Sequence, residues 1–331
     1  SEIVRPTRDG IHGREYISSA VDLGRTPKYL TFSESGALVG EGPQVIDIPL
    51  PIMLRAPSFG SLSQETLKGW ALATKNLGTL LALPDRMLQK DMNRFGSSLV
   101  PVISPGPLDL GSLGEGISMV EIPWTEGWEK TAKTIQDVYP SIMTAVRLPL
   151  EQGVEEKVLS VTEAGASICH LEGSPEGRAM DDDSIFIKDA VQSVHFRLVE
   201  EGIRGGVTLL ASGGISMAEH VAKGIICGAD LVGIDLALQV ALECRVCKRC
   251  ANGLSCPARI ETVEAEWGAS RIRNLMCSWH SQLIEVLGAM GLREVRRLRG
   301  EAGRAMFFED LEKEAFGDVK IAADNRCGSE I

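Results

Sequence analysis

Four cysteines stand within thirteen residues of this chain, at Cys244, Cys247, Cys250 and Cys256, and Pro257 follows the last of them. The spacing C-x2-C-x2-C-x5-C-P allows one short loop to turn four thiolates toward a single compact object. A cubane iron–sulfur cluster is held by four such thiolates, and ferredoxin-type runs also close on Cys-Pro. We therefore predict a redox-active cluster here, [4Fe-4S] with four ligands or [3Fe-4S] with three.

Zinc, disulfides and free thiols are the other chemistries open to this loop. Thiolate sulfur selects iron–sulfur clusters, zinc or Cu(I) over hard cations. Zinc sites usually consist of two separated C-x2-C pairs or include histidine, and the loop has neither a spacer nor a histidine. The spacing therefore favours iron–sulfur over zinc. Cys169 and Cys227 stand apart in apolar surroundings and are expected to be small buried core residues.

Composition narrows the class of protein. The chain has 331 residues, a net charge of −11 and a pI of about 5.1, so no basic face is expected to recruit nucleic acid. No apolar run approaches the ~18 residues of a membrane span, and the first residues lack the apolar segment of a signal peptide. An exported protein would use its cysteines as a disulfide framework. We expect a cytoplasmic enzyme.

Strand-like and helix-like stretches alternate along the chain. The apolar, strand-like runs cover 51–56, 98–103, 117–122, 142–148, 166–170, 207–211 and 230–234. Helical patterns cover 63 to about 83, 126–137, 153–163, 184–201 and 216–227. Strands that alternate with helices of this length are typical of parallel βαβ units, and seven or eight units in one chain favour a closed barrel over an open sheet. The predicted fold is an α/β (β/α)8 TIM barrel.

The barrel accounts for part of the chain only. We expect an amino-terminal extension over 1–45, the barrel over 46–243, the cysteine loop with carboxy-terminal helices over 244–303, and an acidic tail over 304–331. The extension is rich in Gly, Ser and Thr and is expected to be mostly loop.

Two glycine-containing turns follow the last two predicted strands. Ser212, Gly213 and Gly214 form one, and Gly233 and Ile234 end the strand that leads into the other. In TIM barrels the loops after strands seven and eight commonly hold a phosphate. Exposed backbone amides, close approach at glycine and the positive end of a helix dipole provide the attraction. These turns predict a phosphorylated cofactor.

Several of these stretches together resemble one family, the synthase domain of glutamate synthases. The matching segments are 56–63, 212–215, 221–225, 228–230, the cysteine loop with its Cys-Pro, and 292–300. The cysteine spacing is closest to the archaeal-type glutamate synthases and their methylglutamate synthase relatives. The resemblance implies FMN at the barrel mouth, a cluster that passes electrons to it, and hydride delivery to an imine of a 2-oxo acid.

The resemblance also assigns the cofactor contacts. It places Ala56, Pro57 and Ser58 beside the flavin ring, Arg147 where the family usually has a lysine, and the phosphate between Ser212, Gly213 and Gly214 on one side and Gly233 and Ile234 on the other. An arginine can still stabilise a reduced flavin anion, although its planar guanidinium differs from an ammonium group.

The chain departs from the family at the substrate end. Asp235 and Leu236 replace the residues that usually complete the phosphate site, and the family's glycine-rich run is replaced by 170–177. No catalytic residue is identified from the sequence; His170 and Glu172 are the candidates. The cysteine loop is retained, whereas the substrate end is degenerate.

Two functions follow from this pattern. The first is a glutamate synthase-like oxidoreductase subunit that passes electrons between the cluster and FMN. Because the chain lacks a G-x-G-x-x-G nicotinamide motif, its electrons are expected to be exchanged with flavin- or iron–sulfur-containing partner subunits. The alternative is a non-catalytic electron-transfer or scaffold subunit that has lost substrate chemistry and FMN.

Overall fold

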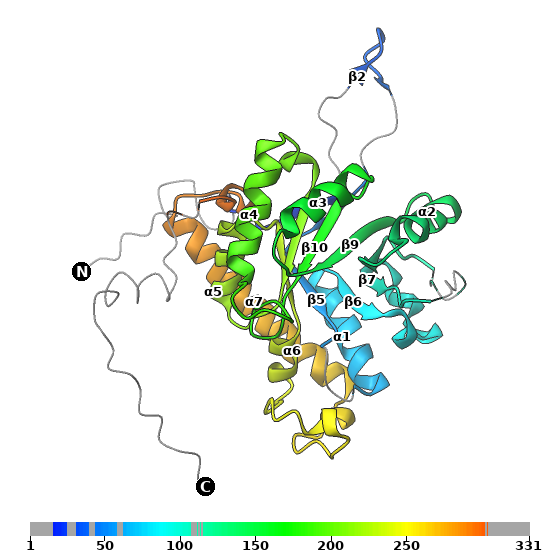
Figure 1. Cartoon of the computed structure of the whole chain (residues 1–331). Helices are drawn as coiled ribbons and strands as arrows, with labels where there is room; N and C mark the ends of the chain where they lie inside the picture. The colour runs from blue at the N-terminus through cyan, green and yellow to red at the C-terminus, as the bar shows by residue number, and fades with distance from the viewer. Residues whose placement is uncertain are drawn as a thin grey trace, which may run out of the picture.

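The structure, a computed structural model, describes residues 16–24, 31–39, 44–57, 62–106, 111, 113, 115–301 and 303. Eight parallel strands close into a barrel in the order β10-β11-β12-β5-β6-β7-β8-β9 (Figure 1). The strands are β5 Ile52–Arg55, β6 Leu81–Pro84, β7 Leu99–Val102, β8 Met119–Pro123, β9 Met143–Pro149, β10 Ile168–Glu172, β11 Thr208–Ser212 and β12 Leu231–Ile234. The predicted (β/α)8 barrel is confirmed.

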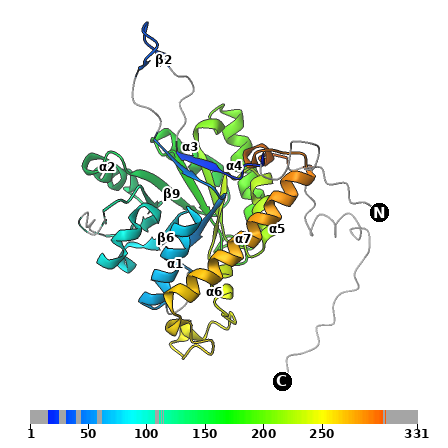
Figure 2. The ribbon, with the colours of Figure 1, turned by 180° about the vertical axis from the view of Figure 1, so that it is seen from behind.

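Helices cover the outside of this barrel. The α-helices are α1 Gln64–Leu77, α2 Trp128–Val138, α3 Val154–Glu163, α4 Ile187–Glu200, α5 Ala218–Ile226, α6 Leu236–Ala241 and α7 Ala265–Ala289. Short 3-10 turns are η2 Asp85–Met87, η3 Lys90–Ser98, η5 Arg204–Gly206, η6 Arg249–Asn252, η7 Ile260–Thr262 and η8 Val295–Leu298. Helix α7 runs across α1 and α5 (Figure 2). Within the described ranges, no helix is long and apolar enough to cross a membrane.

The first helix is shorter than its sequence pattern predicts. Ser63 caps α1 by accepting a hydrogen bond from the amide of Thr66, as expected for an N-cap serine. The predicted end near Leu83 is wrong, because Gly78 adopts the left-handed conformation at φ 68° and ends the helix at Leu77. Residues Leu81–Pro84 then form strand β6. An apolar run of this length fits a buried helix or a buried strand equally well.

The amino-terminal segment covers the end of the barrel at which the strands begin. Strand β1 (Val21–Gly24) pairs antiparallel with β4 (Val45–Ile48), and the amide of Gly24 donates to Oγ1 of Thr208 at 3.0 Å, where β11 begins. A second pair, β2 (Thr31–Phe32) with β3 (Leu38–Val39), projects away from the barrel in both views (Figures 1 and 2). The extension is thus partly strand.

The two ends of the barrel differ in chemistry. The strand cores are apolar and buried, as a sheet covered on both faces requires. Near the carboxyl ends of the strands, however, Arg55, Glu121, His170 and Ser212 are buried polar residues. The loop that carries the four cysteines follows β12 and α6 and therefore lies at this same end, opposite the β2–β3 pair (Figure 2).

Candidate active site at the barrel mouth

A buried ion pair lies at the centre of the mouth. Arg55, the last residue of β5, donates two hydrogen bonds to Glu121 of β8, at 2.8 Å and 2.9 Å. The carboxylate is fully buried and the arginine is 6% exposed. A bidentate pair of this kind fixes both groups in position.

His170 links this pair to the turn after β11. Its Nδ1 lies 3.0 Å from Oε2 of Glu121, and its Nε2 lies 2.6 Å from Oγ of Ser212. Strands β8, β10 and β11 bring the three residues together across the barrel interior. A carboxylate only accepts hydrogen bonds, so a neutral His170 donates from Nδ1 and its Nε2 accepts the hydroxyl proton of Ser212.

Two half-buried charged residues, Arg147 and Glu172, lie next to the buried pair. Arg147 of β9 contacts Glu172 of β10 at 3.0 Å and Glu121 at 3.5 Å. Glu172 also lies 3.4 Å from Arg55. The two candidate residues His170 and Glu172 are therefore in the same network, but only Glu172 is open to solvent.

The charges of the network follow from burial and from its ion pairs. Burial raises the pKa of Glu121, but the nearby Arg55 and His170 outweigh it and hold that pKa well below its usual value. Burial, with Arg55 adding to it, lowers the pKa of His170. The site therefore consists of an anionic Glu121, a cationic Arg55 and a neutral His170 at neutral pH. In this chain Glu121 fixes the Nδ1–H tautomer of His170, which leaves Nε2 to hold the hydroxyl proton of Ser212.

The turn after β11 has the features of an anion site. Gly213 and Gly214 have φ angles of 103° and 71°. A Cβ on Gly213 would lie 2.7 Å from the carbonyl of Gly173, so the loop after β10 packs tightly on this turn. Among the described residues, no backbone acceptor receives the amides of Gly214 or Ile215. These two amides fit a phosphate.

The turn after β12 fits a phosphate less well. A Cβ on Gly233 would lie 2.6 Å from Cδ of Arg55, so this glycine accommodates the buried arginine. Ile234 is fully buried. The carboxylate of Asp235 accepts the amide of Leu236 at 2.5 Å and thus caps α6. An anionic side chain already bonds the first amide of that helix.

The remaining predicted ring contacts lie at the end of β5. Ala56 and Pro57 are half-buried, and Arg147 points its guanidinium into the Glu172 pair. Ser58 lies outside the described residues. These positions fit a flavin ring placed over the mouth. The described residues are thus compatible with FMN at the ring contacts and at the phosphate turn after β11, but less so at the turn after β12.

The four cysteines line one small cavity, together with Gln239, Lys248 and Ile260 among others. Cys247 is exposed and the other three are half-buried. Burial raises the pKa of the Cys244 thiol, and the charges of the other three cysteines raise it further. In the described part of the chain, no three His, Cys, Asp or Glu residues are placed to hold one metal ion. A cluster of several irons holds its thiolates farther apart than a single ion does.

Arg55 and Glu121 were missed in the sequence. Each interrupts an apolar strand, Ile-Met-Leu-Arg and Met-Val-Glu-Ile, and a charged residue inside a strand covered on both faces is itself a signal of a buried pair. Cys169 and Cys227 are buried, as predicted.

The fold and this mouth define a (β/α)8 barrel enzyme with a polar site at the carboxyl ends of its strands. Residues 119–293 match the family model described as the conserved region in glutamate synthase. The chain belongs to the glutamate synthase family, and it is an oxidoreductase.

Three glutamate synthases are similar in sequence to this chain over most of its length. An archaeal-type glutamate synthase (NADPH) of Thermotoga neapolitana is 27% identical over 98% of this chain and 76% of its own length. The archaeal glutamate synthase (NADPH) of Methanocaldococcus jannaschii is 26% identical over 98% and 77%. That of Dehalococcoides mccartyi is 26% identical over 91% and 71%.

Solved structures share the fold. An oxidised active mutant of (S)-mandelate dehydrogenase has a TM-score of 0.55 at 14% identity and covers 85% of this chain and 84% of its own. A mandelate oxidase mutant with a monooxide FMN adduct has a TM-score of 0.53 at 14% identity over 85% and 87%.

Proposed function

We propose that the chain is a glutamate synthase-like oxidoreductase subunit that reduces a carbon–nitrogen double bond formed from a 2-oxo acid, using FMN at the barrel mouth and an iron–sulfur cluster in the cysteine loop. The observation that carries this proposal is the placement of a four-cysteine cavity and a buried acid–base network at the same end of one barrel.

The residues of the mouth have separate roles in this proposal. Bound FMN would supply hydride transfer. Its phosphate would be held by the amides of the Gly213–Ile215 turn, and Arg147 would stabilise negative charge on its ring. Ala56 and Pro57 would shape the ring-facing edge. The buried Arg55 and Glu121 would exclude water from the barrel interior below the ring.

The hydrogen-bonded chain would orient the substrate nitrogen. Reduction of a carbon–nitrogen double bond takes up a hydride at carbon and needs a proton on nitrogen, which a protonated iminium already carries. The Ser212 oxygen, whose own proton is held by Nε2 of His170, would accept a hydrogen bond from that N–H group, and Glu121 would keep the imidazole in the required tautomer.

Flavin binding tests the cofactor directly. Asp235→Asn keeps the cap on α6, because asparagine caps as well as aspartate, but removes the negative charge beside the proposed phosphate. We expect FMN to bind about tenfold more tightly to this variant. Quenching of flavin fluorescence on titration with the cluster-loaded protein measures the dissociation constant.

Asp137→Asn, an exposed change on α2, is the matched control for net charge and should leave FMN binding unchanged. Equal tightening in both variants would show that Asp235 does not face the phosphate. Failure of wild type and both variants to bind FMN, with the cluster intact, would favour the alternative of a flavin-free electron-transfer or scaffold subunit.

The surface around the cysteines supports a partner subunit. Segment 244–260 contains four basic residues and no acidic one in a chain of net charge −11. All four, Arg245, Lys248, Arg249 and Arg259, are exposed; we call them the basic collar. A positive collar around a cluster attracts an acidic redox protein and speeds its association.

Charge reversal tests the basic collar. In the double variant Arg245→Glu/Arg249→Glu, an acidic ferredoxin should reduce the cluster at least tenfold more slowly than in the wild type at low salt. The loss of the cluster's visible absorbance measures this rate. The wild-type rate should fall as salt is added. Lys130→Glu/Lys133→Glu on α2 changes net charge equally; equal slowing in both double variants would contradict a partner site at the collar.

A further inference from the structure

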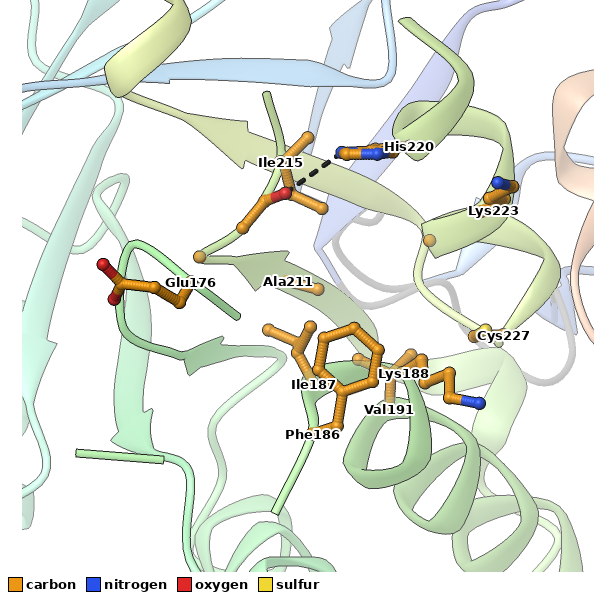
Figure 3. A pocket seen from close by; sticks show the side chains of 13 residues that line it. Glu176, Phe186, Ile187, Lys188, Val191, Ala211, Ile215, His220, Lys223 and Cys227 are labelled. Atoms are coloured by element: carbon orange, nitrogen blue, oxygen red, sulfur yellow. Dashed lines mark hydrogen bonds between the residues drawn. The ribbon is translucent and has the colours of Figure 1, made fainter. Parts of the chain in front are cut away.

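Two cavities lie away from the mouth, and they differ in the charges of their walls. The first lies outside the barrel, over Ala211 of β11 (Figure 3). Its two lysines already have partners, because Lys188 pairs with Asp189 and Lys223 pairs with Glu219. The second cavity lies at the end of the barrel where the strands begin. It has a volume of about 380 Å³, within the range of small-molecule sites.

Segments from both ends of the described chain enclose this second cavity. Residues 18–24, which include β1, form one wall, residues 294–299, which include η8, form another, and the start of β11 completes the lining. Backbone hydrogen bonds join the two walls. The amide of Ser18 donates to the carbonyl of Arg293 at 2.8 Å, and the amide of Val295 donates to the carbonyl of Ser18 at 2.9 Å. The cavity therefore has fixed walls.

The carboxy-terminal wall has an excess of positive charge, because each of its two carboxylates is shared by two arginines. These groups are Asp230 with Arg204 and Arg299, and Glu294 with Arg296 and Arg297. Nε of Arg296 donates to Glu294 at 2.6 Å, and its Nη groups donate to no acceptor among the described residues. A guanidinium has five N–H donors, so Arg296 can also bind the carboxylate of a ligand.

The amino-terminal wall is acidic. Asp22 lines the cavity, and Asp47 of β4 is its direct partner in the β1–β4 pair. Directly paired residues point to the same face, where two like charges repel each other. The pKa of Arg296 is raised first by its hydrogen bond to Glu294 and then by the charge of Asp22, so the acidic and basic walls interact. A cation bound at Asp22 would relieve the repulsion from Asp47.

We propose that this cavity binds the zwitterion of an α-amino acid with an aliphatic side chain. Its ammonium group lies at Asp22, its carboxylate at Arg296, and its side chain against Val21 and Val207, which also line the cavity. An α-amino acid carries both charged groups on one carbon atom, so it satisfies both walls at once. A simple carboxylate brings an anion to the acidic wall without a cation, and a simple amine leaves Arg296 without a carboxylate.

Calorimetric titration of the full-length, cluster-loaded protein tests binding without any turnover. The probes are L-norvaline, pentanoate, which lacks its ammonium group, and butylamine, which lacks its carboxylate. We expect L-norvaline to bind at least tenfold more tightly than either, because each missing group removes a hydrogen bond to a charged partner. Equal affinity for L-norvaline and for either of the other two probes would overturn the proposal.

Two variants assign the charges. Asp22→Asn should weaken L-norvaline about tenfold without weakening pentanoate, and Arg296→Gln should weaken L-norvaline about tenfold without weakening butylamine. Asp137→Asn on α2 and Arg273→Gln on α7 are the matched controls and should leave binding of all three probes unchanged. All four residues are exposed, so the variants are expected to fold. Equal weakening of L-norvaline by Asp22→Asn and Asp137→Asn would contradict the assigned site.

A third variant distinguishes this cavity from the mouth. Arg147 lies near the carboxyl end of β9, at the opposite end of the barrel, so Arg147→Met should bind L-norvaline as the wild type does. Loss of binding in Arg147→Met but not in Asp22→Asn would place the ligand at the mouth and overturn the proposal. None of these outcomes depends on whether the flavin titration supports the proposed function.

Discussion

Replacing either Cys247 or Cys256 by serine is expected to remove most of the protein's iron and inorganic sulfide, or to convert a four-iron cluster into a three-iron one. A serine oxygen is a harder and poorer ligand for iron than a thiolate. The four cysteines line one cavity, so loss of one leaves an open position on the cluster. Iron and sulfide analysis with an absorbance spectrum, on protein purified without oxygen, measures the outcome.

Two other cysteines are the controls. Cys277 is exposed and lies outside the loop, and burial raises the pKa of the Cys169 thiol to about 12, so Cys169 stays a neutral thiol and a poor ligand. Cys277→Ser and Cys169→Ser should keep full iron. Full iron in Cys247→Ser and Cys256→Ser would refute the assignment of the cluster to this loop. A colourless wild-type protein that contains zinc would indicate a structural zinc site instead.

The barrel was predictable because its signal is repeated along the chain. Each of the runs near 117–122, 142–148 and 207–211 is an apolar stretch followed by a helical pattern, and the agreement of many units outweighs an error in any one. Strand β6 shows where prediction from apolar runs fails. Leu80 to Leu83 continue the apolar character of α1, and only the left-handed Gly78 separates helix from strand.

The mouth was predictable only in part. The glycine turns after the last two strands pointed to Ser212 and a phosphate, resemblance to a family pointed to Arg147, and His170 and Glu172 were candidates without an assigned role. The partners of His170 come from strands β8 and β11, 49 and 42 residues away. No local spacing encodes a contact across a barrel. The close packing of Gly233 on Arg55 likewise depends on two strands from opposite ends of the barrel sequence.

The buried pair gives the largest expected effect on stability. Glu121→Gln removes the bidentate counter-charge of the buried Arg55 guanidinium and leaves it only the half-exposed Glu172, 3.4 Å away; breaking a buried pair in this way costs about 3–5 kcal/mol. Urea unfolding at neutral pH measures the loss. Arg55→Met combined with Glu121→Leu removes both charges and should recover most of it, because an apolar replacement of a whole buried pair is often close to neutral. A double variant as unstable as Glu121→Gln would show that packing, not charge, dominates.

The pH dependence of the same variant identifies the charge itself. The folded-state pKa of Glu121 lies well below its ordinary value, so its contribution to stability is complete above that ordinary value and is lost as the pH falls through the folded pKa. His170 acts in the same direction: its lowered pKa makes the wild type lose stability as the pH falls below about 6.5. The gap in unfolding free energy between wild type and Glu121→Gln should therefore be widest near neutrality and narrow below about pH 4. A gap that is independent of pH would mean that Glu121 is not held as an anion beside Arg55.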